Sequence, residues 1–253
     1  MPQPRVGLQL IIYGRRPQTD LAGVLAEVAA AKYDGFEGGL LGSREQVERT
    51  RAALAPTGMA FIGGHCGLGD LKDLEGLRRR LPHVKALGGR YVISSGDSSF
   101  SSLNDYLETA KLLSQAGRVC QEEGLTLCYH NHHWEFRKLD GTTAMHAMVG
   151  ATDPEVVKLC PDVYWVHVGG EQPAEFIARY QDRCPYFHFK DGMGGDQARD
   201  FRELGRGKVD LRAALKAALA CKPEWIVVEQ DTTQLDPAES NRISREYLKG
   251  LGV

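Results

Sequence analysis

The stretch Cys184–Gly192, CPYFHFKDG, carries the clearest indication of the fold of this chain. Its apolar residues form a short run typical of a buried β-strand. The run ends in an imidazole, a cation and a carboxylate, supplied by His188, Lys190 and Asp191. Active sites built on parallel strands lie at the carboxyl ends of those strands, so this pattern predicts a functional site at a strand end.

Two further runs end in the same kind of side chain. LTLCYHNHHWEF presents His130, His132 and Glu135 after an apolar segment, and EWIVVEQD presents Glu229 and Asp231 after another. Imidazole and carboxylate groups are common metal ligands in proteins. Several strands are therefore expected to direct metal-binding side chains toward one place.

Eight strand-like segments alternate with eight amphipathic, helix-like segments along the 253 residues. The strand-like segments are 6–12, 35–38, 60–64, 90–95, 125–130, 156–160, 186–190 and 225–230, and the helix-like ones are 21–32, 44–54, 74–87, 105–123, 143–149, 174–180, 211–220 and 238–250. This alternation and length predict a (β/α)₈ barrel that forms a single domain over residues 1–253. No glycine-rich dinucleotide fingerprint follows the first strand, which argues against a Rossmann fold.

Glycines mark the expected ends of helices and one irregular segment. Gly58, Gly117 and Gly124 stand where helices are expected to stop. The segment 192–208, with three early glycines, is expected to be either a mobile cover of the barrel mouth or an ordinary surface excursion.

The composition narrows the classes of partner and compartment. The chain has 31 Lys and Arg against 33 Asp and Glu, a balance that offers no basic surface for nucleic acid. It shows neither an export leader nor an apolar run long enough to span a bilayer, so we expect a cytoplasmic protein without membrane association. The six cysteines lack a CxxC pair and are expected to be buried, reduced thiols.

The polar residues that end the strands are candidates for a divalent-metal site. Asp162, His188 and Glu229 are the firmest ligand candidates because each ends a separate strand, and strand ends converge in a barrel. Carboxylates combined with imidazoles suit Mn²⁺, Co²⁺, Mg²⁺ or Zn²⁺. Such an ion polarises a carbonyl and stabilises the enediolate formed when a proton leaves the adjacent carbon.

Taken together, these motifs resemble those of the xylose isomerase-like barrel superfamily of sugar isomerases and epimerases. The resemblance covers nearly the whole chain and rests on Tyr129-His130-Asn131-His132 with Glu135-Phe136, on Asp162-x-x-Trp165, on His188-x-Lys190-Asp191, and on Glu229. Members of the superfamily include tagatose-type epimerases, inosose dehydratases and isomerases, and metal-bearing subunits of C-glycoside deglycosidases.

The resemblance implies one divalent ion, with Mn²⁺ favoured, held by a Glu, an Asp, a His and a second Glu. Asp162, His188 and Glu229 take three of these places. His130 stands where many relatives have the first Glu, so either His130 binds the ion or Glu135 reaches back from the loop. We favour Glu135 because a second glutamate oxygen preserves the hard character of the site.

The resemblance also implies the chemistry. The epimerases use two metal-bound glutamates as an acid–base pair, which would be Glu135 and Glu229. Because strand five departs from that pattern, His132 or His130 is the alternative base on one face. We expect an isomerase or epimerase of a sugar or keto-polyol that acts through an enediolate. A lyase that eliminates a β-substituent is the close alternative, and a repair nuclease or a non-catalytic sugar-binding barrel is a weaker one.

Five further residues are expected to contact the substrate, in part by the resemblance: His65, Trp165, His167, Lys190 and Asp191. No glycine-rich phosphate cradle accompanies them, which favours an unphosphorylated sugar or keto-sugar. A homo-oligomer or a complex with a partner subunit is expected from the resemblance alone.

Overall fold

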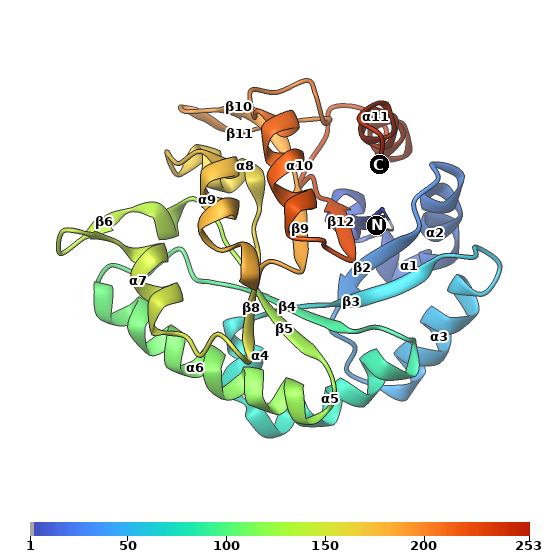
Figure 1. The fold of residues 1–253 in the computed structure, drawn as a ribbon. Helices are drawn as coiled ribbons and strands as arrows, with labels where there is room; N and C mark the ends of the chain where they lie inside the picture. Colours follow the sequence, from blue (N-terminus) through green and yellow to red (C-terminus); the bar gives the residue numbers. More distant parts are fainter. Residues whose placement is uncertain (1–2) are drawn as a thin grey trace.

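The chain forms a barrel of eight parallel strands in the computed structural model, which describes residues 3–253 (Figure 1). The strands are β1 (Arg5–Gln9), β2 (Gly35–Gly39), β3 (Ala60–Gly67), β4 (Tyr91–Ser95), β5 (Thr126–His130), β8 (Val157–Cys160), β9 (Tyr186–Phe189) and β12 (Trp225–Val228). Their order is β8-β5-β4-β3-β2-β1-β12-β9, with every neighbouring pair parallel. A bridge between Asp162 and His188 joins the two ends of this order, so the predicted barrel is confirmed.

Helices surround the strands, as Figure 1 shows. The longer ones are α2 (Leu21–Ala30), α3 (Arg44–Leu54), α5 (Leu74–Ala86), α6 (Leu103–Glu122), α7 (Ala144–Ala151), α9 (Pro173–Arg179), α10 (Leu211–Ala220) and α11 (Pro237–Gly250). Asp20 and Ser43 cap α2 and α3 by accepting a hydrogen bond from a backbone N–H of the first turn. Within residues 3–253, no helix has both the length and the apolar character needed to cross a membrane.

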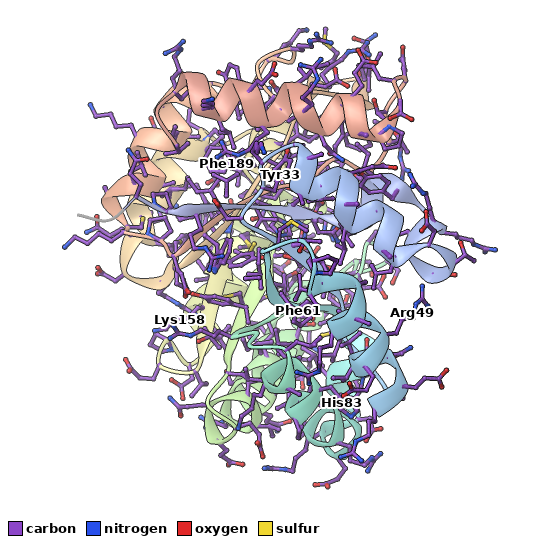
Figure 2. The ribbon with its side chains drawn as sticks, turned by 90° about the vertical axis from the view of Figure 1, so that its right-hand side faces the viewer. Tyr33, Arg49, Phe61, His83, Lys158 and Phe189 are labelled. Atoms are coloured by element: carbon purple, nitrogen blue, oxygen red, sulfur yellow. The ribbon has the colours of Figure 1, made fainter. Side chains whose placement is uncertain are left out.

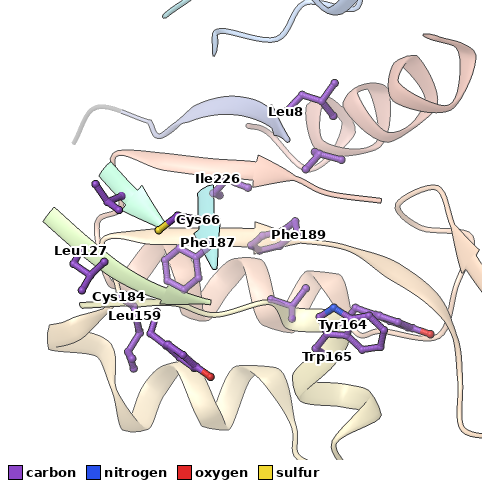
Figure 3. Close-up of a cluster of buried hydrophobic side chains, with 14 of the residues drawn as sticks. Leu8, Cys66, Leu127, Leu159, Tyr164, Trp165, Cys184, Phe187, Phe189 and Ile226 are labelled. Atoms are coloured by element: carbon purple, nitrogen blue, oxygen red, sulfur yellow. The ribbon is translucent and has the colours of Figure 1, made fainter. Parts of the chain in front are cut away.

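Alternate side chains along each strand belong to two different apolar layers. One set points into the barrel and forms a small cluster that includes Ile93, Cys128, Cys160, Tyr186 and Val227. The other set packs between the strands and the helices, where Figure 3 shows Leu159, Phe187, Phe189 and Ile226. Because side chains along a strand alternate between its two faces, the residue two positions after each inward-facing apolar residue also faces the interior.

The outer layer is closed by side chains from the helices and the remaining loops. Figure 2 shows Phe61 in the interior and Arg49 at the outer edge of the molecule.

All six cysteines are free; five are buried and Cys221 is half-buried. The expectation of reduced thiols therefore agrees with the structure.

The glycine-rich segment after β9 begins as a β-hairpin beside α8 (Val163–Val168) (Figure 1). Its strands are β10 (Asp191–Gly194) and β11 (Gln197–Arg202). Tyr164 fastens the hairpin from both sides: its hydroxyl donates to the carbonyl of Ala198 at 2.8 Å and accepts from the N–H of Gly194 at 3.2 Å. The hairpin is thus a wall held against α8. A shorter hairpin, β6 (Lys138–Leu139) with β7 (Thr142–Thr143), follows β5.

Gly117 lies inside α6 and does not end it, contrary to the sequence-based expectation. A Cβ atom at this position would lie 2.5 Å from the carbonyl oxygen of Val156, just before β8. Glycine is required here because the helix approaches the neighbouring backbone too closely for any side chain.

This close approach predicts the effect of a methyl group. Gly117→Ala gains about 1 kcal/mol of helix propensity, but the clash with Val156 costs about 2–3 kcal/mol. We therefore expect a net loss of about 1–2 kcal/mol in the free energy of unfolding, measured by urea denaturation. Gly150→Ala in α7 is the control: its Cβ would meet nothing within 4 Å, so the same exchange is expected to stabilise the protein. Equal effects of the two substitutions would contradict this account.

Candidate metal centre

Four polar side chains from separate strands meet inside the barrel at its carboxyl end. His130 ends β5, His188 lies in β9, and Asp162 and Glu229 follow β8 and β12. Each stands two residues beyond an inward apolar residue, so alternation along the strand turns it toward the interior. All four are buried, and one potential ligand atom from each lies within 4.8 Å of the others.

The two imidazoles of this group carry buried nitrogens that no hydrogen bond satisfies. Nδ1 of His188 lies 2.8 Å from Oε2 of Glu229 without forming a hydrogen bond. Nδ1 of His130 has no partner among the described residues either, and its Nε2 lies 3.3 Å from Oδ2 of Asp162. Unsatisfied buried nitrogens are rare in folded proteins. Nitrogen and oxygen atoms that converge in this way fit a bound cation.

The charge around the cluster also favours a cation. Four carboxylates, those of Glu37, Asp162, Glu229 and Asp231, stand against the ammonium of Lys190 and the imidazole of His188. Burial acts to lower the pKa of His188, but Cys160, Glu37 and Glu229 outweigh it and hold that pKa well above its usual value. Burial raises the pKa of Asp162 to about 7, against the attraction of Lys190. Burial also acts to raise the pKa of Glu229, but His188 and Lys190 outweigh it and hold that pKa well below its usual range. A buried surplus of negative charge is costly unless a positive ion accompanies it.

Glu37 supports the cluster from β2, across the interior of the barrel. Its buried carboxylate contacts Nε2 of His188 at 2.7 Å, accepts from the hydroxyl of Tyr186 at 2.7 Å, and contacts Nδ1 of His65 at 2.9 Å. Burial acts to raise the pKa of Glu37, but His188 and His65 outweigh it and lower the pKa to about 2. A carboxylate behind an imidazole fixes which ring nitrogen faces a metal, and here Nδ1 of His188 is left to the cluster.

Asp162 is held in place by its neighbours in the loop after β8. One carboxylate oxygen, Oδ1, caps α8 by accepting from the N–H of Trp165 at 2.9 Å. The backbone N–H of Asp162 donates to Oδ1 of Asn131 at 3.1 Å. The second carboxylate oxygen, Oδ2, is therefore the one directed at His130. Asn131 stands in the same motif as His130, but its anchoring role depends on a contact with the loop after β8 that no local pattern indicates.

Glu135 lies outside the group of four. It sits in the short helix η2 (Trp134–Phe136), fully buried, where Oε1 accepts from the hydroxyl of Tyr129 at 2.8 Å and Oε2 from the backbone N–H of His132 at 2.9 Å. Burial raises the pKa of Glu135 to about 7, against these hydrogen bonds. Both oxygens are thus engaged within strand five and its loop. The geometry favours His130 over Glu135 as the ligand from this strand.

Lys190 lies beside the cluster on the inward face that it shares with His188. Its Nζ is 3.2 Å from Oε1 of Glu229 and contacts the carboxylate of Asp231. It also lies 4.6 Å from the ring centroids of Trp165 and Phe201, a cation–π arrangement. Asp231 was visible in the sequence two residues after Glu229, but its pairing with Lys190 depends on β9 and β12 being neighbours in the barrel.

Three other candidate residues, His65, His132 and His167, lie in different surroundings. His65 is partly exposed at the mouth, and its Nε2 contacts Oγ of Ser95 at 3.2 Å. His132 stacks on Trp134 with ring centroids 4.1 Å apart, beside the ring of His130. His167 instead lies near Gly194 of the β10–β11 hairpin.

The carboxylate of Asp191 is hydrogen-bonded to backbone N–H groups. Its carboxylate accepts from the N–H groups of Gly192, Gly205, Gly207 and Val209 at 2.9–3.2 Å. The carboxylate therefore holds the loop at 205–209 against the start of the hairpin. The substrate contact expected of Asp191 has no support in this geometry.

Comparison with known proteins places the fold among described families. A family model for the xylose isomerase-like TIM barrel matches residues 25–251. A sugar phosphate isomerase/epimerase from Parabacteroides distasonis superimposes with a TM-score of 0.83 at 19% identity, over 98% of each chain. A zinc-bound IolI protein superimposes with a TM-score of 0.77 at 13% identity, over 98% of this chain and 97% of its own.

A relative among curated proteins is an inosose dehydratase from Geobacillus kaustophilus. It is 29% identical in an alignment of 178 positions that covers 61% of this chain and 54% of the dehydratase. The chain thus spans about half the length of this relative.

The contacts of Asp191 lead to a prediction that separates a structural role from a substrate contact. Asp191→Ala leaves four N–H groups without their charged acceptor, so we expect a loss of about 3 kcal/mol in the free energy of unfolding. Amide hydrogen exchange at Gly205, Gly207 and Val209 should become faster, while metal affinity is retained. Asp196→Ala, in the exposed turn of the same hairpin, is the control and should change neither quantity. Unchanged stability and exchange for Asp191→Ala would disprove the structural role.

Proposed function

Because the chain belongs to the xylose isomerase-like TIM barrel family, we propose that it is a divalent-metal enzyme that isomerises a sugar or keto-polyol. The proposed reaction moves a proton between carbon atoms next to a carbonyl group. The observation that carries the proposal is the buried group of His130, Asp162, His188 and Glu229, whose ligand atoms converge within 4.8 Å.

These four residues would hold the ion through two imidazoles and two carboxylates. When bound, the ion would polarise the substrate carbonyl and stabilise the negative charge that develops as the neighbouring proton leaves. Two nitrogen donors suit Zn²⁺, Co²⁺ or Mn²⁺ better than Mg²⁺, which prefers oxygen ligands. The donor set supports Zn²⁺ and Co²⁺ at least as well as the Mn²⁺ expected from the resemblance.

His132 is our choice for the group that moves the proton. Of the three catalytic candidates, Glu135 is engaged by Tyr129 and His132, and Glu229 by His188 and Lys190. Nδ1 of His132 has no hydrogen-bond partner among residues 3–253, and stacking on Trp134 fixes the plane of its ring. Glu135 acts on this residue indirectly, because its bond to the backbone N–H of His132 positions the imidazole.

The remaining polar groups would bind and orient the substrate. His65, steadied by Glu37 and Ser95, faces the mouth and can donate to a substrate hydroxyl. Lys190 offsets the negative charge of Glu229 and Asp231 and lies against Trp165, so it keeps the wall of the site fixed.

A single base supports isomerisation more than epimerisation. Inverting a carbon centre requires proton transfer on both faces of the substrate, whereas moving a proton between adjacent carbons on one face requires one base. The alternative is an elimination that begins with the same proton removal and then expels a β-substituent. The similarity to an inosose dehydratase favours this second candidate.

The choice of ligand from strand five can be tested by metal binding. We predict that His130→Ala lowers the affinity for Zn²⁺ by about 100-fold or more, because a ligand is lost. Glu135→Gln should change it by less than about threefold, since Glu135 is engaged elsewhere. Isothermal titration calorimetry and metal content after dialysis measure both. The opposite pattern would make Glu135 the ligand.

The reaction and its base can be tested together by solvent deuterium exchange. With the metal-loaded protein and a panel of ketoses and inososes in D₂O, we expect deuterium to enter a carbon next to the carbonyl without loss of water. His132→Gln should lower the rate by about 10²–10⁴-fold at unchanged metal content. His133→Gln, at the neighbouring position, is the control and should retain the rate. Release of water would favour the elimination, and an active His132→Gln would exclude His132 as the base.

A further inference from the structure

A cavity of about 500 Å³ lies beside the mouth of the barrel, outside the four-residue cluster. Its walls come from η1 (Leu10–Tyr13), which follows β1, from the end of β2 and its loop, and from α3. Its volume falls within the range of pockets that bind small organic molecules. The cluster and its supporting residues do not require this space.

The cavity and the candidate metal centre share one residue, Glu37. Glu37 lines the cavity, and its carboxylate lies 2.7 Å from Nε2 of His188. Gly39 stands two residues later on the same face of β2 and also lines the cavity. A Cβ atom at Gly39 would meet nothing within 4 Å, so the missing side chain leaves this position open.

The walls of the cavity suit an uncharged, mainly apolar group. Leu10, Leu40 and Leu41 line it, and Ile11 at its edge is 42% exposed, which is unusual for a large apolar side chain in this structure. An exposed apolar residue at the edge of a pocket is typical of a binding surface.

Three of the polar side chains that line the cavity are engaged by nearby backbone groups. Oε1 of Gln9 accepts from the N–H of Ile11, and Oε1 of Gln46 accepts from the N–H of Gly42. Arg49 is the one Lys or Arg among the described residues that line the cavity. It donates to the carbonyl of Pro17 at 2.7 Å and lies at the outer edge of the molecule (Figure 2). One engaged arginine does not form a phosphate site, which normally combines several donors.

We propose that this cavity binds an uncharged substituent, of about the size of an aryl group, carried by the sugar whose carbonyl lies at the metal centre. The inference rests on the proposed function and makes its substrate a substituted sugar rather than a free monosaccharide. Gly39 is the specificity-determining position, because it leaves room for the substituent between the mouth and the cavity.

Ligand binding to the metal-loaded full chain tests this inference without turnover. The probes are the phenyl and methyl β-D-glycosides of 3-keto-glucose and 3-keto-galactose, which retain a carbonyl group for the metal centre, with glucose 6-phosphate as an anionic probe. We expect at least one phenyl glycoside to bind at least tenfold more tightly than its methyl counterpart by calorimetry. Saturation-transfer NMR should place the strongest contact on the phenyl protons.

Substitutions then locate the effect. Gly39→Leu should reduce the affinity for the phenyl glycoside to that for the methyl glycoside, and Ile11→Gln should reduce it in part, both with unchanged metal content. Gly150→Leu is the matched control, since Gly150 is also an open glycine but lies on α7 outside the cavity. Circular dichroism and metal content report whether each variant folds.

Three results would overturn the inference. They are equal or undetectable binding of the phenyl and methyl glycosides, a phenyl preference that survives both substitutions, and tighter binding of glucose 6-phosphate than of any phenyl glycoside. Failure of the proposed function gives a different result, because metal binding or deuterium exchange would then be absent while the phenyl preference remained.

Discussion

The contact between Glu37 and His188 spans the interior of the barrel, and the site depends on it. β2 and β9 are not neighbours in the sheet, so this contact joins two strands that share no backbone hydrogen bonds. The carboxylate also accepts from Tyr186 and contacts His65, so one buried group orients side chains on β3 and β9 together. With Nε2 occupied, Nδ1 of His188 is the nitrogen left to face Glu229. The supporting carboxylate thus determines the geometry of the proposed ligand set.

The same arrangement concentrates negative charge in a buried region, which opposes folding in the absence of a cation. Lys190 offsets part of it through Glu229 and Asp231, and His188 offsets a further part through its contacts with Glu37 and Glu229. A ligand that binds only the folded state stabilises that state in proportion to its concentration and affinity. The affinity for a cation and the stability of the barrel are therefore linked, because a bound cation would offset the charge of carboxylates that lie above an apolar layer.

Most of the fold and part of the site follow from the two-residue period of the strands. Tyr186, His188 and Lys190 alternate along one strand, so the sequence alone indicated that the two polar residues share the inward face. The strand ends also supplied Asp162 and Glu229. Contacts between distant segments could not be predicted in this way. The helix α6 has glycine at position 117 because the backbone of Val156 approaches it closely, and Glu135 is engaged by Tyr129 and the backbone of His132. These relations depend on distances between elements, which local patterns do not encode.

Strand five determines which reaction the site can perform. If Glu135 bound the ion, two carboxylates could act on opposite faces of a substrate, as in the epimerases that the sequence resembles. The engagement of Glu135 by Tyr129 instead leaves the imidazole of His130 as the member of the cluster from strand five, and a second imidazole, His132, without a partner for Nδ1 among the described residues. The stacking of His132 on Trp134 fixes the plane of its ring, so in the proposed mechanism it serves one face of the sugar. A one-sided base is compatible with isomerisation and with elimination, and what distinguishes these outcomes is whether the substrate carries a leaving group next to the carbon that loses its proton.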